Sequence, residues 1–173
     1  TKQLAIEEAM RQLHTIQNEP LLSANIKMTE WLQQGLDVSY RASDGQIRCD
    51  HLKLIDQENI DNNVFTVVNQ WTIVNGTNTK RADIVVFING LPIAVVELKS
   101  PTREVTNSEE AWLQLQNYMR RVPQLFTACQ LCVISDMADT RVGSITAPLD
   151  RFMEWKTTDG SYESTSVADF ETL

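Results

Sequence analysis

The feature that most constrains the fold is a pair of apolar runs separated by a strong turn signal. Residues 84–88 read IVVFI and residues 93–96 read IAVV, with Asn89-Gly90 between them. Asn-Gly between two strand-like segments favours a tight β-hairpin. Apolar runs without polar alternation are typical of strands that are covered on both faces of their sheet. The sequence therefore predicts a buried hairpin in the centre of a sheet.

The segments around this hairpin predict an α/β fold, because helical spacing and strand-like alternation both occur along the chain. The expected helices cover residues 2–17, 22–32 and 107–122, and the other expected strands cover residues 36–41, 47–55, 65–73, 131–134 and 141–146. We expect a helical part over about 1–35, a core over about 36–156 and a loose tail over about 157–173.

Composition excludes several classes of protein. The 173 residues include 15 basic and 23 acidic side chains, a net charge of −8, which argues against binding nucleic acid through bulk positive charge. No window approaches the roughly 20 apolar residues of a membrane-spanning helix. Three cysteines and the lack of a visible signal peptide favour a reducing compartment, so we expect a cytoplasmic protein. The chain begins inside a helical pattern, so we also expect a fragment of a longer protein.

Charged residues at the ends of the buried hairpin are the best candidates for chemistry. Asp83 precedes the first strand, and Glu97-Leu98-Lys99 ends the second. Glu97 and Lys99 share one face of a strand, whereas Leu98 points the other way, into the core. Two carboxylates and an ammonium group on one face suit a hard divalent cation such as Mg²⁺, with Lys99 acting on anionic charge or on an attacking water.

This site requires a hairpin register that places Asp83 and Glu97 on the same face of the sheet. Residues that pair across two strands have their side chains on the same face of the sheet. Asp83 and Glu97 therefore share a face only if the numbers of paired residues in this hairpin add up to an even value. A two-residue Asn89-Gly90 turn pairs Ile88 with Leu91, which gives an odd sum and opposite faces. We therefore predict an odd-length connection or a β-bulge.

On spacing alone, a structural ion pair explains these residues as well as a metal site does. Gln114 and Tyr118 lie four residues apart, beside the apolar stripe of the 107–122 helix, where they suit contact with a phosphate or a base near the site. A pair of residues at the boundary of a buried helix face explains them too.

The remaining motifs are interpreted as structural. Cys129-x-x-Cys132 has the spacing of a redox or zinc motif, but it lies in an apolar, strand-like stretch where residues three apart face opposite ways. We expect both to be core cysteines. His14 and His51 are isolated, without an identifiable nucleophile as partner.

Together these residues resemble a known family. RADIVVF over residues 81–87, followed by IAVVELKSP over residues 93–101, resembles the PD-D/E-x-K nuclease motif, and Gln114-x-x-x-Tyr118 resembles its accompanying Q-x-x-x-Y motif. With NGLP over residues 89–92 between them, these segments are similar in sequence to the N-terminal nuclease domain of the restriction subunit of type I restriction–modification enzymes. The resemblance implies a restriction-endonuclease-like core, with a central mixed β-sheet flanked by helices.

The resemblance also implies roles for individual residues. Asp83 and Glu97 would hold Mg²⁺, for which Mn²⁺ is a possible substitute. Lys99 would act on the water or the phosphate, and Gln114 and Tyr118 would support the site or touch DNA. The cations expected near double-stranded DNA are Lys80, Arg81, Arg103, Arg120 and Arg121.

Two departures from the family pattern follow. Ala82 stands where the motif name has Pro, which is not a metal ligand. A further acidic ligand in an earlier helix is not identified; Glu7, Glu8 or a residue before Thr1 could supply it.

The partners follow from the same resemblance. The chain has no G-x-x-x-x-G-K-[ST] phosphate loop, so ATP would act only through helicase-like motor domains absent from it. Methylation and specificity subunits would be further partners, with no membrane involved.

Three functions remain open. The first is a Mg²⁺-dependent DNA endonuclease domain without its own sequence recognition. The second is a catalytically silent nuclease-fold domain for docking or DNA binding. The third is a RecB-like exonuclease or resolvase, which needs a surface for DNA ends or junctions. The intact Asp83, Glu97 and Lys99 set favours the first over the second.

Overall fold

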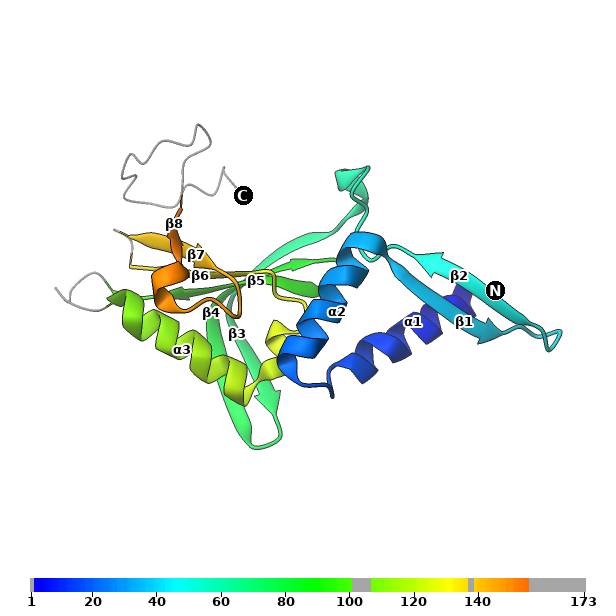
Figure 1. The fold of residues 1–173 in the computed structure, drawn as a ribbon, viewed down its shortest axis with the longest axis horizontal. Coiled ribbons are helices and arrows are strands. Elements are labelled where there is room, and N and C mark those ends of the chain that lie inside the picture. The colour runs from blue at the N-terminus through cyan, green and yellow to red at the C-terminus, as the bar shows by residue number, and fades with distance from the viewer. Residues whose placement is uncertain (1, 101–106, 137–138, 156–173) are drawn as a thin grey trace.

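The computed structural model describes residues 2–100, 107–136 and 139–155, and its fold is α/β (Figure 1). The helices are α1 (Lys2–Ile16), α2 (Leu21–Gln34) and α3 (Asn107–Arg121), with short 3-10 helices η1 (Ile60–Asn62), η2 (Pro123–Phe126) and η3 (Leu149–Arg151). The strands are β1 (Leu36–Arg41), β2 (Ile47–Leu52), β3 (Phe65–Asn75), β4 (Asn78–Ile88), β5 (Leu91–Leu98), β6 (Leu131–Ser135), β7 (Thr140–Gly143) and β8 (Met153–Glu154).

A six-stranded mixed sheet in the order β3-β4-β5-β6-β7-β8 forms the centre of the molecule. β5 and β6 are parallel and the other pairs are antiparallel. Two parallel neighbouring strands must be joined by a crossover connection, and α3, which lies between β5 and β6 in the chain, forms this connection. α3 packs along one face of the sheet. The predicted mixed sheet flanked by helices is confirmed.

The main core lies between α3 and this sheet. Leu115 of α3 and Val122, which follows the helix, are fully buried against Val85 of β4 and Val95 of β5. These positions recur at helical spacing in α3 and at strand spacing in the hairpin, so the core follows from the sequence pattern. The hairpin strands occupy interior positions in the sheet, as predicted.

The β4–β5 hairpin has the bulge that the site requires. Asn89 and Gly90 have φ angles of 52° and 81°, as a tight two-residue turn needs, and Ile88 pairs with Leu91. The register then shifts, so that Val86 pairs with Ala94 and Ile93 is the extra residue of β5. The prediction of an odd-length connection or a bulge is confirmed in its second form.

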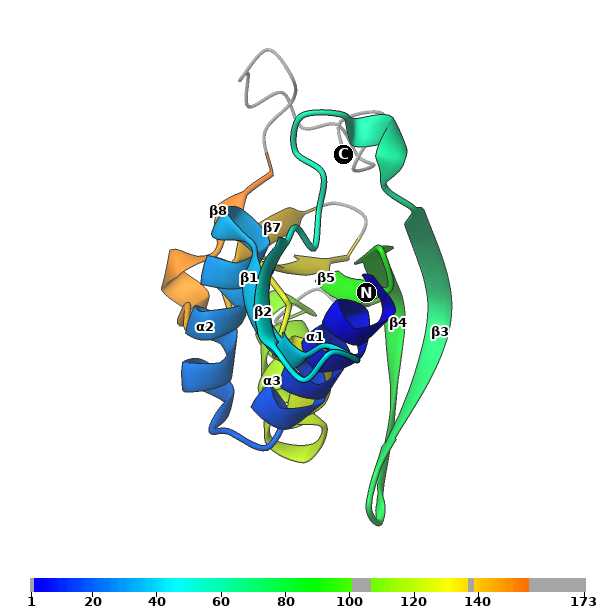
Figure 2. The ribbon, with the colours of Figure 1, turned by 90° about the vertical axis from the view of Figure 1, so that its right-hand side faces the viewer.

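The N-terminal part forms a smaller layer of its own. β1 and β2 make a two-stranded antiparallel sheet, and Ala5 and Ala9 of α1 pack against Leu36 and Val38 of β1. Figure 2 shows this layer beside the main sheet, with β3 at the sheet's outer edge. β2 ends at Leu52, earlier than the predicted strand over 47–55, and the predicted tail over 157–173 lies outside the described residues. No helix in the described ranges is long and apolar enough to cross a membrane.

Candidate active site

Asp83 and Glu97 converge where β4 and β5 run side by side. Ile84 pairs with Val96, and the same register continued by one residue places Asp83 opposite Glu97. The backbone N–H of Leu98 donates to Oδ2 of Asp83 at 2.9 Å, which ties this carboxylate to the end of β5. The two predicted carboxylates therefore lie on one face of the hairpin.

Gln70 of β3 is a further neighbour of Asp83 that sequence reasoning missed. Its Nε2 donates to Oδ1 of Asp83 at 3.0 Å, and its backbone is left-handed, with φ of 53°. A signal was present, because β3 and β4 are joined by a two-residue turn in which Asn75 pairs with Asn78. That register, followed along the strand, places Gln70 opposite Asp83.

Glu97 is the most unusual group of the site. It is only 3% exposed. Its Oε1 accepts a hydrogen bond from Nζ of Lys99 at 2.9 Å, whereas its Oε2 is buried and has no hydrogen-bond partner among the described residues. Burial raises the pKa of Glu97 above its usual value, and the nearby charge of Asp83 adds to this, while the bond from Lys99 opposes it. A desolvated carboxylate oxygen without a donor is costly, so this arrangement calls for a positively charged ligand.

Lys99 lies at the boundary between this buried pair and solvent. Its side chain is 25% exposed, and its backbone N–H donates to the carbonyl oxygen of Ser135 on β6 at 2.8 Å. Glu97 and Lys99 thus lie together at the end of β5, as predicted. Leu98 is 43% exposed, so the prediction that it enters the core is wrong. β5 ends at Leu98, and its side chain lies on the face opposite α3, which the described residues leave uncovered there.

Tyr118 and Gln114 of α3 reach the site through the backbone of β4. The Tyr118 hydroxyl donates to the carbonyl oxygen of Arg81 at 2.8 Å and accepts from Nε2 of Gln114 at 3.0 Å. Burial, helped by the charges of Glu97 and Asp83, raises the pKa of Tyr118 to about 12. Tyr118 belongs to the core and is only 3% exposed, so its predicted place beside the apolar stripe is wrong. The stripe of α3 is wide enough to include it because the helix packs directly on β4.

The predicted cations fall into two groups. Lys80 and Arg81 lie on β4 next to Asp83, and Arg120 and Arg121 lie exposed at the end of α3. Arg103 lies outside the described residues.

A third carboxylate does not join the pair. Within residues 2–100, 107–136 and 139–155, no group of three His, Cys, Asp or Glu side chains is placed to hold a metal ion. Glu8 pairs with Arg11 at 2.6 Å, and Glu7 accepts from Gln3 on the same helix. α1 packs on β1, and neither Glu7 nor Glu8 joins Asp83 and Glu97 in a group of three such side chains in this structure.

Comparison with protein families decides which family this arrangement belongs to. Residues 1–151 match the model of the family described as type I restriction enzyme R protein N terminus. The chain belongs to this family. The matched residues include every described member of the candidate site, and the predicted resemblance to the N-terminal part of type I restriction subunits is confirmed.

Individual members of the type I restriction enzyme R protein N terminus family are similar to this chain. The type I restriction enzyme HindI endonuclease subunit of Haemophilus influenzae is 36% identical over 145 residues, which cover 83% of this chain and 14% of that protein. A putative type I restriction enzyme MjaIXP endonuclease subunit of Methanocaldococcus jannaschii is 39% identical over 131 residues, which cover 73% of this chain and 12% of that protein. The chain therefore spans a small part of the length of these relatives.

The cysteines and histidines that the sequence indicates to be structural lie outside the candidate site. Cys129 and Cys132 are both buried, which confirms that they are core cysteines. Their Sγ atoms are nevertheless 4.0 Å apart, because Cys129 precedes β6 and is not on the strand. His51 contacts Asp37 through Nδ1 at 2.7 Å across β1 and β2, and the pKa of His51 is raised mainly by that hydrogen bond. His14 is exposed on α1.

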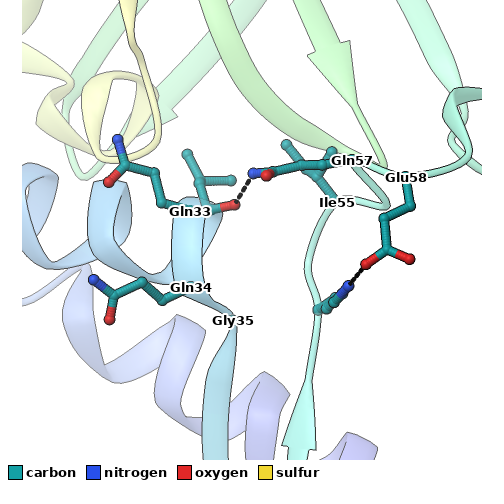
Figure 3. Close-up of a pocket in the computed structure, with 8 residues that line it drawn as sticks. Gln33, Gln34, Gly35, Ile55, Gln57 and Glu58 are labelled. Carbon is teal, nitrogen blue, oxygen red and sulfur yellow. Dashed lines mark hydrogen bonds and ion pairs between the residues drawn. The ribbon is translucent and has the colours of Figure 1, made fainter.

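A separate cavity lies at the end of α2 and contains none of the candidate residues (Figure 3). It has a volume of about 90 Å³ and is lined by residues such as Gln34, Lys53 and Ile55. Gln57 donates to the carbonyl oxygen of Leu32 at 3.1 Å, which closes one side. These contacts cap the last turn of α2 and join it to the loop after β2.

Proposed function

We propose that this chain is the nuclease domain of a type I restriction endonuclease subunit and that it hydrolyses DNA phosphodiester bonds with a divalent cation. The observation that carries this proposal is the buried Oε2 of Glu97, which has no hydrogen-bond partner in the described part of the chain and lies beside Asp83 and Lys99. A structural ion pair would leave no carboxylate oxygen desolvated without a donor, and it would not bring a second carboxylate close. The relatives named as endonuclease subunits support the same conclusion.

The residues present fit Mg²⁺, and Mn²⁺ suits the same oxygen ligands. Mg²⁺ in proteins usually binds one or two carboxylates and keeps several waters, so Asp83 and Glu97 would hold it without a third protein carboxylate. When bound, the cation would polarise the phosphate and lower the pKa of its water.

The surrounding side chains have positioning roles in this proposal. Lys99 neutralises Glu97 and, at the solvent boundary, donates to a phosphate oxygen that approaches the pair. Gln70 and the N–H of Leu98 hold the two oxygens of Asp83, which fixes the orientation of that carboxylate. Tyr118, held by Gln114, fixes the backbone of β4 two residues before Asp83.

The wider assembly is part of the proposal. We place the domain in the cytoplasm, on double-stranded DNA, together with methylation and specificity subunits. ATP would act only through helicase-like motor domains elsewhere in the restriction subunit, because this chain has no phosphate-binding loop.

Nicking of a supercoiled plasmid tests the proposed activity. The chain is incubated with Mg²⁺ or Mn²⁺, in parallel with Asp83→Asn, Glu97→Gln and Lys99→Ala variants and with Asp50→Asn as a control on the exposed β2. We expect nicking by the parent and the control and a loss of at least about 100-fold in the three site variants. Nicking that persists at the parental rate in Asp83→Asn and Glu97→Gln would contradict the proposal.

A catalytically silent DNA-binding or docking domain is the second candidate. Only two carboxylates meet within the described part of the chain, which favours this alternative. A parent that binds the divalent cation but does not nick DNA would support it.

A further inference from the structure

The outer half of the β3–β4 hairpin, residues 71–82, ends in a tip that projects from the body of the molecule. Figures 1 and 2 show its tip extending past the end of α3, beyond the rest of the sheet. We call this segment the arm. Asn75 pairs with Asn78 around Gly76-Thr77, so the tip is a tight two-residue turn. The tip is fixed to the end of α3, because Nδ2 of Asn75 donates to the carbonyl oxygen of Arg121 at 3.1 Å.

The arm is free of negative charge in a strongly acidic chain. Residues 64–82 contain no Asp or Glu, and neither do residues 111–135, which include most of α3 and the segment after it. The chain as a whole has 23 acidic residues. The acidic side chains therefore lie on other segments, and the surface formed by the arm and the end of α3 carries only positive charge.

Four cations of this surface have no carboxylate partner among the residues that the structure describes. They are Lys80, Arg81, Arg120 and Arg121. Among the other described cations, Arg11, Lys27, Arg48, Lys53, Lys99 and Arg141 each pair with a carboxylate, whereas Lys2, Arg41 and Arg151 do not. Unpaired cations on a projecting, acid-free surface suit a polyanionic partner.

The dimensions of the arm suit a DNA groove. A two-stranded ribbon fits the major groove of B-DNA, and neighbouring residues of a strand point to opposite faces. Lys80 and Arg81 therefore lie on opposite faces of the ribbon, and Lys80 shares its face with Ile73, which packs against the main core. Asn78 is five residues from Asp83 along β4, a distance of about 16 Å, or about half a turn of the double helix.

We propose that the arm and the end of α3 form a duplex-binding surface, in which the arm enters the major groove and its cations contact the flanking phosphates. This inference rests on the proposed nuclease function, which makes DNA the polyanion, and it adds how the duplex is oriented over Asp83 and Glu97. The polar tip, Asn75 to Thr79, offers amide and hydroxyl groups to the groove.

A salt titration of DNA affinity tests the surface. Anisotropy of a short labelled duplex is measured in EDTA over a range of NaCl concentrations for the parent and for a Lys80→Gln, Arg81→Gln, Arg120→Gln, Arg121→Gln variant. The control is Lys27→Gln, Arg41→Gln, Arg48→Gln, Lys53→Gln, which removes the same charge from α2, from the β1–β2 sheet and from the loop after β2. We expect the salt slope of the arm variant to fall by about 0.9 for each phosphate that the variant no longer neutralises and its affinity to fall at least about tenfold, with the control near the parent.

Entry into the groove has its own test. Thr77→Cys in a Cys49→Ser background carries a tethered copper–phenanthroline group, since Cys49 is the exposed cysteine and the other two are buried. We expect scission of the duplex by the group tethered at position 77, and none by the same group tethered at Cys49 in the unmodified chain, because Cys49 lies on β2, away from the arm.

Three results would overturn the inference: no measurable DNA binding by the parent, equal losses of affinity in the arm variant and the control, or no scission from position 77. Because EDTA removes divalent cations, the affinity titration is independent of hydrolysis. Loss of affinity in the arm variant together with unaltered nicking in Asp83→Asn and Glu97→Gln would overturn the proposed function and leave the surface standing. The reverse pattern would overturn the surface alone.

Discussion

Among single residues, Glu97 has the least favourable environment for a charge. Burial and the neighbouring Asp83 raise the pKa of Glu97, and Lys99 reaches only one of its oxygens. Such a group lowers the stability of the metal-free fold, as is common where function requires a destabilised site. The stability of the fold should therefore depend on the charge of this one side chain.

We expect Glu97→Gln to raise the free energy of unfolding at neutral pH in EDTA, because it removes a buried charge close to Asp83. The parent loses stability as pH rises from the ordinary carboxyl value of 4.5 through the raised pKa of Glu97, since the folded state binds the proton more tightly than the unfolded state in that window. The gain in the variant therefore shrinks towards acidic pH.

Denaturant unfolding across this pH range measures the difference between Glu97→Gln and the parent. Glu8→Gln is the control, because the hydrogen bond from Arg11 lowers the pKa of Glu8 and the same substitution there yields no gain. Equal stability of parent and Glu97→Gln at every pH would contradict the account of this carboxylate.

Tyr118→Phe tests the link between α3 and β4. The variant keeps the buried ring but loses the bond to the carbonyl oxygen of Arg81, so we expect a loss of about 1 kcal/mol in the free energy of unfolding. We also expect weaker binding of divalent cations, because the backbone that carries Asp83 is less well fixed. Trp112→Phe, which removes the bond from Nε1 to Ala147 elsewhere on α3, is the control. Unchanged metal affinity in Tyr118→Phe would show that Tyr118 only packs.

At the scale of elements, the hairpin was the best-predicted part of the fold. The apolar runs and Asn89-Gly90 predicted its strands and turn, and the demand that Asp83 and Glu97 share a face predicted the bulge. The sequence did not predict that Ile93 is the extra residue. That position depends on tertiary contacts: its carbonyl oxygen accepts from the N–H of Gln130, and its side chain packs beside α2.

Gly90→Ala tests the turn of this hairpin. Gly90 has φ of 81°, and a Cβ there would have no atom within 4 Å, so the cost comes from the backbone conformation alone. We expect a loss of about 1 kcal/mol in the free energy of unfolding. Gly45→Ala is the matched control: Gly45 has a similar φ of 82° in the β1–β2 turn, away from the site, and a Cβ there also has no atom within 4 Å. A neutral effect of Gly90→Ala would mean that the turn relaxes to another type.

The elements also show why parts of the site escaped prediction. Spacing identified Asp83, Glu97 and Lys99, because one strand face and one hairpin register are local properties. Gln70 and the role of Tyr118 depend on how β3 and α3 pack on β4, which spacing within one segment does not define. Roles for the site residues stay predictions, as does the division of the chain into parts.

At the scale of the whole molecule, charge is unevenly distributed. The net charge of −8 argued against bulk binding of nucleic acid, yet residues 64–82 and 111–135 contain no acidic side chain. Overall composition therefore concealed a local surface that the fold assembles from two distant segments. The relatives are several times longer than the matched region.

The central claim is that Asp83 and Glu97 form one divalent-cation site. Calorimetric titration of Mg²⁺ and Mn²⁺ into the parent, Asp83→Ala, Glu97→Ala and the control Asp50→Ala tests it most directly. We expect saturable binding in the parent and the control that is lost in both site variants. Saturable binding that survives in Asp83→Ala and Glu97→Ala, or no binding in the parent, would contradict the claim.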